Sequence, residues 1–378
     1  MRVAFVVSGL ATGGAEMMLY KLLKTLAPAR VQPLVISLGR CGRPASLIEG
    51  LGITVLRLRL DERGAAALPH ATLTAYRSLK RFEPELLSGW MYHGNLMAWA
   101  LACLLKVPLA WNIRQTLNLS QEKAMTQRVI RFGAYLSRTP AKLMYVSHQA
   151  RAQHRALGYF DERAVVLPNG FEVDLWRRDA AEGKRLRSEL SIDDQACVVG
   201  HLARFHPMKD QIGLLEAARR VAAEEPAVRF VLAGEGLSAS NATLATAVRR
   251  CGLAGRVMLL GETAAPQRLL SACDVFCLPS AWGEGFPNAV GEAMACELPC
   301  VVTRIGEGPD LVDTTGVVVE PGDHEALARA ILQLVRAGPA VRSALGAQAR
   351  ARIATHFSLA QVAAHYAEMF EAAAGSTA

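Results

Sequence analysis

Residues 197–234 read CVVGHLARFHPMKDQIGLLEAARRVAAEEPAVRFVLAG and set the pattern for the whole chain. The apolar, valine-rich run at 197–203 predicts a buried strand, and a helix-length segment follows it at 210–224. A second apolar run at 229–234 predicts another strand. Strands that alternate with helices form parallel sheets, so this stretch predicts an α/β fold whose sheet is covered by helices on both faces.

The same alternation continues in both directions along the 378 residues. Two such series in a chain of this length predict two doubly wound, Rossmann-like domains. A turn at Pro168-Asn169-Gly170 marks the seam. We therefore expect domains at 1–168 and 169–357 and an Ala-rich helical tail at 358–378. The expected strands lie at 3–7, 33–38, 53–58, 85–90, 109–114, 142–147, 197–203, 229–234, 256–261, 274–280, 300–303 and 317–320.

The composition excludes several classes of protein. Hydrophobic residues make up 51% of the chain and charged residues 20%, which excludes a mainly disordered protein. The longest apolar run, at 96–105, is shorter than the roughly 20 residues that a bilayer span needs. The run at 3–7 is too short for the core of a signal peptide. We expect a cytoplasmic protein.

The cysteines are the first candidates for a metal site. Cys273-x3-Cys277 and Cys296-x3-Cys300 have a spacing that could suggest metal ligands, although it differs from the usual C-x2-C. Both pairs fall in or beside expected strands, and the alternation of side chains along a strand would not gather four thiols at one point. We therefore expect no metal site here.

Charge is divided unevenly along the chain. Residues 1–170 hold 22 Lys and Arg against 9 Asp and Glu, and the remaining residues hold 20 against 25. A basic half suggests an anionic partner: phospholipid, phosphorylated substrate or nucleic acid. The segment 121–142 mixes five basic residues with apolar ones at helical period, which suits a helix on an anionic membrane surface. A core helix with a solvated face would give the same pattern. Nucleic acid fits least well, because no recognition module is visible.

Ligands of doubly wound sheets bind beyond the carboxyl ends of the strands, and we expect the two domains to form a cleft there. After the first strand, Gly13 and Gly14 could let backbone N–H groups approach a phosphate or sugar, although a plain tight turn would look the same. After the strand at 197–203, Arg204 and Lys209 could clamp a diphosphate. Two solvated loop charges are the alternative.

The segment 280–294, SAWGEGFPNAVGEAM, is the most informative of these loops. Glu284 follows an expected strand, and Pro287 suits the first turn of a helix that carries Glu292. The two carboxylates could accept hydrogen bonds from sugar hydroxyls, while the helix N-terminus would favour an anionic leaving group. The plainer explanations are that Glu284 is a charge at a helix start and that Glu292 is a surface residue. Glu292, however, has apolar sequence neighbours, which is an unusual setting for an unpartnered carboxylate.

These motifs together resemble glycosyltransferase family 4, a group of retaining, nucleotide-sugar-dependent enzymes of GT-B fold. EGFPNAVGEAMA resembles the E-x7-E signature of the family, and VGHLARFHPMKD resembles its diphosphate-binding segment. VVLPNGFEVDLW is similar to the interdomain junction. WMYHGNL and WNIRQT look like the subgroup that assembles surface polysaccharide and O-antigen. The resemblance covers nearly the whole chain, and it implies that the tail helix packs back toward the first domain.

The resemblance implies roles for individual residues on the donor side. Glu292 would hold the ribose hydroxyls and Glu284 the hydroxyls of the donor sugar, while Arg204 and Lys209 would bind the diphosphate. Glu262 would flank the base. Three residues of the signature would line the sugar and phosphate pocket: Phe286, Pro287 and Asn288.

In the first domain, Gly13 and Gly14 match the glycine loop of the family, and His93 matches its histidine at the sugar. A histidine satisfied by neighbouring groups in a loop is the alternative for His93. Gln115 stands where the subgroup usually has histidine, which leaves the acceptor side open.

The implied reaction needs no cofactor and no metal ion. The chain contains no Asp-x-Asp, so Arg204, Lys209 and a helix dipole would neutralise the departing diphosphate. The donor would be a nucleotide sugar, with UDP the commonest base in the family and GDP an alternative. A glycan or polyprenyl-diphosphate-linked oligosaccharide would be the acceptor, and the basic domain could contact an anionic membrane peripherally.

Three other functions fit parts of this pattern. A nucleotide-sugar epimerase of the same fold would convert the donor without an acceptor. A non-catalytic accessory subunit would bind the nucleotide and turn nothing over. A lipid- or polymer-binding protein would use the basic half alone. The acid pair and the phosphate clamp favour the transferase.

Overall fold

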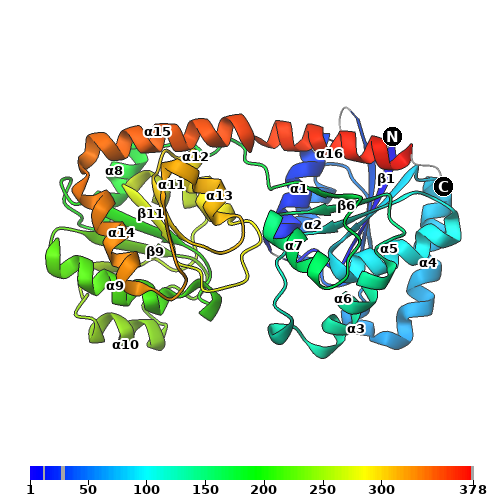
Figure 1. Cartoon of the computed structure of the whole chain (residues 1–378), viewed down its shortest axis with the longest axis horizontal. Helices are drawn as coiled ribbons and strands as arrows, with labels where there is room; N and C mark the ends of the chain where they lie inside the picture. Colours follow the sequence, from blue (N-terminus) through cyan, green and yellow to red (C-terminus); the bar gives the residue numbers. More distant parts are fainter. Residues whose placement is uncertain (12, 27–29, 376–378) are drawn as a thin grey trace. The chain divides into compact units, whose positions relative to one another are not determined.

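The computed structural model describes residues 1–11, 13–26 and 30–375 (Figure 1). The chain divides into two compact units, which we call the N-terminal unit (Met1–Gly170 with Leu359–Ala378) and the C-terminal unit (Phe171–Ser358). Each unit is an open, all-parallel sheet with helices on both faces. The predicted fold class, α/β with two doubly wound Rossmann-like units, is therefore confirmed.

The N-terminal unit has seven strands in the order β3-β2-β1-β4-β5-β6-β7. The order reverses between β1 and β4, which pair in parallel from Val3 opposite Leu86 onward. The strands are β1 (Arg2–Val7), β2 (Gln32–Ser37), β3 (Val55–Arg57), β4 (Leu86–Trp90), β5 (Leu109–Ile113), β6 (Lys142–Tyr145) and β7 (Ala164–Val166). The helices are α1 (Gly14–Leu26), α2 (Arg43–Glu49), α3 (Leu60–Arg63), α4 (Leu68–Phe82), α5 (Met91–Leu105), α6 (Ala124–Leu136), α7 (His148–Ala156) and α16 (Leu359–Ala374).

Helix α16 belongs to the N-terminal unit and closes its core. Its apolar face packs with α1 and α2 on the sheet, and Phe370 meets Phe5 of β1 edge-on with ring centroids 5.7 Å apart. The hydroxyl of Tyr366 lies 3.2 Å from the side-chain oxygen of Asn112. The fully buried guanidinium of Arg114 binds this hydroxyl and donates to the carbonyl oxygen of Leu167 at 3.0 Å. The last helix is thus fastened to the sheet by aromatic packing and by a buried polar network.

The C-terminal unit has six strands in the order β10-β9-β8-β11-β12-β13. Helices α9, α10 and α14 lie on one side of the sheet, and α8, α11 and α12 lie on the other, where α15 packs against α12 (Figure 1). The strands are β8 (Val198–Leu202), β9 (Arg229–Ala233), β10 (Val257–Leu259), β11 (Val275–Leu278), β12 (Cys300–Thr303) and β13 (Val317–Val319). The helices are α8 (Ala180–Glu189), α9 (Gln211–Glu224), α10 (Ala242–Arg250), α11 (Pro266–Ala272), α12 (Asn288–Ala295), α13 (Gly308–Val312), α14 (His324–Arg336) and α15 (Gly338–His356).

Candidate functional site

In the C-terminal unit the strand order reverses between β8 and β11. Loops at such a switch point diverge and leave room for a ligand at the carboxyl ends of the strands. The loop after β8 carries Arg204 and Lys209, and the loop after β11 carries Ser280 and Glu284. The sheet topology therefore brings the two predicted donor motifs to one place, although Lys209 and Glu284 are 75 positions apart in the chain.

Lys209 and Glu284 form an ion pair with each other. Their side chains are only 16% and 10% exposed, which strengthens their attraction relative to a surface pair. The hydroxyl of Ser280 donates to the same carboxylate oxygen at 2.7 Å, and the hydroxyl of Thr303 donates to the Ser280 carbonyl at 2.6 Å. The carboxylate of Glu284 is thus held by Ser280 and Lys209, while Thr303 of β12 fixes the backbone of Ser280.

A second set of bonds shapes the loop that carries Arg204, whose side chain is exposed. The amide of Gln211 donates to the Arg204 carbonyl at 2.9 Å and lies 3.3 Å from Nε2 of His201. Nδ1 of His201 lies 3.0 Å from the Cys277 carbonyl. Full burial lowers the pKa of His201 to about 4, so the ring is neutral, donates through Nδ1 and accepts through Nε2.

Helix α12 carries the remaining signature residues. Pro287 is its N-cap, Asn288 is its first residue, and Glu292 lies about one turn further on. The ring of Phe286 packs in an aromatic cluster with Phe171 and Phe357, at centroid distances of 6.0 and 5.8 Å. Phe286 is buried in this cluster.

A glycine fixes how closely α12 can approach its neighbours. A Cβ atom on Gly291 would lie 2.0 Å from the Phe171 ring, so a larger residue would displace the helix that positions Glu292. Glu262 lies elsewhere in the unit, exposed in the loop after β10. Its neighbour Gly261 has φ of +72° and accepts a hydrogen bond from Gly234 N at 2.7 Å, which joins this loop to the loop after β9.

In the N-terminal unit the switch point lies between β1 and β4. Gly13 and Gly14 stand there at the start of α1, with the carboxylate of Glu16 against Gly13, and burial raises the pKa of Glu16. His93 lies in the first turn of α5 directly after β4 and is partly exposed. A Cβ atom on the adjacent Gly94 would lie 2.5 Å from the Val6 carbonyl, so the glycine lets this turn sit against β1.

A hydrogen-bond chain with a fixed direction lies beside His93. Burial lowers the pKa of His154 to about 4, and its Nδ1 lies 2.7 Å from the Ala150 carbonyl. Nδ1 therefore donates, and Nε2 accepts from the Tyr92 hydroxyl at 3.0 Å. The Gln115 side chain hydrogen-bonds Tyr92, and its amide donates to Glu122 at 3.0 Å. The Tyr92 hydroxyl donates its proton to His154, so it can only accept from Gln115. The side-chain NH2 of Gln115 therefore donates to both Tyr92 and Glu122, and its carbonyl oxygen is left as an acceptor.

The negative charge of Glu122 also reaches His93. Partial burial lowers the pKa of His93, and the carboxylate of Glu122 acts in the opposite direction. The surroundings of His93 thus offer a carboxylate and the carbonyl oxygen of Gln115, both suited to accepting hydrogen bonds from hydroxyl groups.

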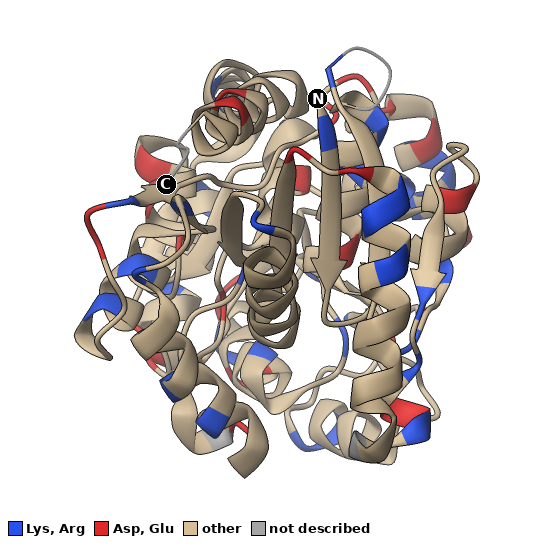
Figure 2. Cartoon of the chain, turned by 90° about the vertical axis from the view of Figure 1, so that its right-hand side faces the viewer, with Lys and Arg blue, Asp and Glu red and all other residues tan. Residues whose placement is uncertain are grey.

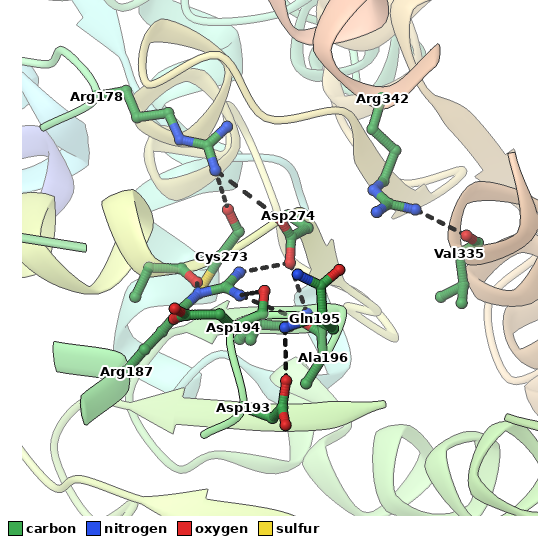
Figure 3. Close-up of polar contacts among 12 residues, drawn as sticks. Arg178, Arg187, Asp193, Asp194, Gln195, Ala196, Cys273, Asp274, Val335 and Arg342 are labelled. Carbon is green, nitrogen blue, oxygen red and sulfur yellow. Dashed lines mark hydrogen bonds and ion pairs between the residues drawn. The ribbon is translucent and has the colours of Figure 1, made fainter. Parts of the chain in front are cut away.

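The opposite, amino ends of β8 and β11 hold a different charged cluster (Figure 3). Arg187 pairs with Asp274 at 2.6 Å and donates to the carbonyls of Ala272 and Ala196 at 2.8 and 3.1 Å. Asp274 also accepts from the backbone N–H of Val198 at 2.8 Å. These bonds join α8 to both strands, and fixed backbone groups use most of the hydrogen-bonding capacity of the arginine. The cluster is a structural tie.

The described residues contain neither a cluster of metal ligands nor a membrane-spanning helix. Within 1–11, 13–26 and 30–375, no group of three His, Cys, Asp or Glu side chains is placed to hold a metal ion. No helix in these ranges is long and apolar enough to cross a bilayer.

Several residues of the site were missed from the sequence. Ser280 ends an expected strand, and only its contact with Glu284 reveals its role. Glu122 lay in no motif, and Tyr92 lay within WMYHGNL but had no role assigned to it. His154 lies 62 positions from the tyrosine that it orients. The loop after the expected strand at 109–114 was the available signal for Glu122, since polar residues beyond strand ends are candidates in this fold.

Two family models match the chain, each on one unit. "Glycosyl transferase 4-like domain" matches residues 13–170, and "Glycosyl transferases group 1" matches residues 196–337. The chain belongs to the GT-B glycosyltransferases.

Known proteins similar to this chain agree with that assignment. The putative glycosyltransferase EpsF of Bacillus subtilis is 32% identical over 38% of this chain and 36% of its own length. The UDP-Gal:alpha-D-GlcNAc-diphosphoundecaprenol alpha-1,3-galactosyltransferase of Escherichia coli is 29% identical over 47% of this chain and 46% of its own length. The chain thus spans about half or less of these two relatives. The structure of Anabaena Alr3699/HepE in complex with UDP superimposes with a TM-score of 0.87 at 23% identity, covering 98% of this chain and 100% of that one.

Proposed function

We propose that the protein is a retaining glycosyltransferase that moves a sugar from a UDP-sugar to a glycan carried on a polyprenyl diphosphate, in surface-polysaccharide synthesis. Its family supports the transfer reaction. The Anabaena protein of the same fold was crystallised with UDP and with UDP-glucose, which supports the donor. The name of the Escherichia coli relative, which includes a diphosphoundecaprenol, supports the acceptor.

The ion pair of Lys209 and Glu284 at the C-terminal switch point is the observation that carries the donor site. A poorly exposed ammonium with two further N–H donors can bind diphosphate oxygens, while the adjacent carboxylate can accept from sugar hydroxyls. Arg204, exposed on the same loop, can add a bidentate contact to phosphate. Glu292 would hold the ribose hydroxyls, and Glu262 would flank the base.

The chemistry that we propose is a front-face displacement. The acceptor oxygen bonds to the anomeric carbon on the face from which the diphosphate leaves, so the configuration is retained. The bond between that carbon and the diphosphate oxygen breaks, and the departing oxygen takes the proton of the acceptor. Lys209, Arg204 and the first turn of α12 would stabilise the developing negative charge in place of a metal ion.

The N-terminal unit would bind the acceptor. The carboxylate of Glu122 and the carbonyl oxygen of Gln115 can accept from acceptor hydroxyls beside His93. Both groups are held in place before any ligand arrives, which reduces the entropy lost on binding.

A thermal-shift panel of UDP, GDP, ADP and dTDP with their sugars, with and without EDTA, tests the donor site. A ligand at 100 times its Kd should add about 2.7 kcal/mol of stability. We expect a shift with UDP compounds that EDTA does not change. A shift abolished by EDTA would overturn metal independence, and no shift with any nucleotide would overturn the donor site.

Product analysis then separates the transferase from its alternatives. Purified protein, a UDP-sugar and a synthetic polyprenyl-diphosphate-linked N-acetylhexosamine should yield an elongated lipid and UDP. Conversion of the UDP-sugar without acceptor would identify an epimerase. Binding without turnover of any sugar would identify an accessory subunit.

A further inference from the structure

Helices α4, α5 and α6 of the N-terminal unit expose basic and apolar side chains, and we call the surface that these helices form the α4–α5–α6 face. None of the three helices contains an Asp or Glu. Within the described chain, none of the basic residues on these helices takes part in an ion pair, and all are exposed. These residues are Arg77, Lys80, Arg81, Arg128 and Arg131.

Large apolar side chains are exposed on the same helices. On α6, Met125, Phe132 and Tyr135 are 62%, 50% and 78% exposed. Their spacing of seven and three residues places them on one stripe of the helix. Leu73 on α4 and Leu104 at the end of α5 are also exposed. Single exposed apolar residues are ordinary, but a cluster of them on adjacent helices marks a binding surface.

Helix α5 packs beside both α4 and α6. Trp99 of α5 meets Phe132 of α6 edge-on at 6.5 Å. A hollow of about 520 Å³ lies between α4 and α5. Another, of about 690 Å³, is lined by the end of α5 and the start of β5, with Lys106 and Arg163 among its residues. Figure 2 shows this side of the molecule with Lys and Arg in blue.

We propose that the α4–α5–α6 face docks on an anionic lipid bilayer, with the apolar stripe of α6 in the headgroup region and the cations on lipid phosphates. Unpaired cations beside exposed apolar tips suit an interface that is negatively charged at its surface and apolar below. A second copy of the chain would bring like charges together, which disfavours self-association through this face. The inference uses no residue of the donor site, so it goes beyond the proposed function.

The charge pattern sets the size of the expected effect. Each cation near an anionic surface contributes about fivefold to the partition coefficient. Removing two cations should therefore lower partitioning by about 25-fold, and reversing their charge should lower it further. High salt should weaken binding, because the Debye length falls from about 10 Å at 0.1 M to about 3 Å at 1 M.

Vesicle co-sedimentation tests the proposal. The probes are phosphatidylcholine vesicles with about a third phosphatidylglycerol and vesicles of phosphatidylcholine alone. We expect the full chain to bind the anionic vesicles and to be released by salt. Arg128→Glu with Arg131→Glu should reduce binding by about 25-fold or more, and Met125→Ser with Tyr135→Ser by about fivefold.

Matched variants on the C-terminal unit control for net charge and for exposed apolar area. Arg249→Glu with Arg329→Glu changes the net charge equally, and Leu175→Ser with Val341→Ser removes similarly exposed apolar side chains. Both should bind vesicles like the wild type. Equal loss in face and control variants would overturn the proposal, as would a wild-type chain that ignores anionic vesicles.

Two further readouts separate this proposal from others. Arg128→Glu with Arg131→Glu should keep the melting shift with UDP, so failure of the donor site and failure of the membrane face are distinguishable. If sedimentation velocity shows a dimer that this variant dissociates, and the wild type ignores vesicles, the face belongs to a second copy and the bilayer proposal is wrong.

Discussion

Two ion pairs lie at the opposite ends of the neighbouring strands β8 and β11, and they differ in the groups that surround them. At the amino end, Arg187 binds Asp274 at 2.6 Å (Figure 3). At the carboxyl end, Lys209 binds Glu284. Both pairs are largely buried, so burial and charge alone do not distinguish them.

The difference lies in the hydrogen bonds that remain. Arg187 donates to three backbone carbonyls besides Asp274, and Val198 N–H donates to that carboxylate. In the described chain Lys209 Nζ has Glu284 as its one partner, which leaves two N–H donors for a ligand. A buried ion pair whose donors are used by fixed backbone groups is structural, whereas a pair with donors to spare at a switch point is a candidate site.

The largest effect should come from breaking the amino-end pair. Asp274→Asn leaves Arg187 without its counter-charge and should lower the free energy of unfolding by about 3 kcal/mol, the low end of the range for buried pairs because Asp274 is partly exposed. Urea titration measures this loss. At a temperature where the variant is folded, its affinity for UDP should equal that of the wild type.

The exposed pair of Arg268 with Glu189 supplies a control for that substitution. Glu189→Gln should leave the urea midpoint unchanged, because exposed pairs contribute little. If Asp274→Asn weakened UDP binding while stability stayed the same, the amino-end cluster would be functional and the comparison would be wrong.

Breaking the carboxyl-end pair of Lys209 and Glu284 should reduce activity much more than stability. Glu284→Gln keeps the shape of the side chain but removes its charge, and should lower kcat/KM by about 100- to 1,000-fold, comparable to the loss of one transition-state contact. Initial rates with a UDP-sugar and acceptor measure this effect. The melting temperature should change far less than in Asp274→Asn, and a drop as large would make the pair structural.

Lys209→Met sharpens the test at the same end. Methionine retains much of the aliphatic length of lysine but cannot bind diphosphate, so UDP should lose its stabilising effect while uridine, which has no phosphate, binds as it does to the wild type. Equal UDP shifts in Lys209→Met and wild type would remove the lysine from the donor site.

The sequence was sufficient to predict the sheets because their strands lie in short, mostly apolar runs rich in β-branched residues. It also placed Lys209 and Glu284 at strand ends, where the fold collects ligands. It did not reveal their pairing, which depends on which strands become neighbours at the reversal of strand order. The tie of Arg187 to Asp274, 87 positions apart, was hidden for the same reason.

Helix α15 shows the limit of periodicity. Only Gly346, Ala349 and Ile353 are buried along its 19 residues, so it has almost no apolar stripe to detect. The basic segment at 121–142 was ambiguous for a related reason. Helix α6 buries Ile130, Gly133 and Leu136 and also exposes a second apolar stripe, and a one-dimensional pattern could not separate the two.

His201 lies on β8 and hydrogen-bonds the Cys277 carbonyl of β11, so it links the two strands at whose ends the ion pairs lie. Its pKa of about 4 lies below the ordinary value of 6.5, so unfolding takes up a proton at pH values between the two. Its contribution to stability is full above about pH 6.5 and falls by about 3 kcal/mol as the pH drops to about 4.

Thermal unfolding between about pH 7 and about pH 4 measures this dependence. His201→Gln should flatten it in part, since His154 of the N-terminal unit, with a pKa also near 4, still titrates. An unchanged pH dependence in His201→Gln would show that His201 is not the titrating group, and the loop of Arg204 would then have another anchor.

The smallest effect concerns Glu292, which lies on helix α12. Glu292→Ala should weaken UDP binding by about tenfold, the equivalent of one charge-assisted hydrogen bond, whereas Glu284→Ala should mainly lower turnover. Titration calorimetry with UDP compares the two, and thymidine diphosphate, which lacks the 2′-hydroxyl, supplies the control. If Glu292 binds the ribose, its removal should cost less affinity for thymidine diphosphate than for UDP. Equal losses would place Glu292 outside the ribose site and leave Lys209 and Glu284 as the core of the donor site.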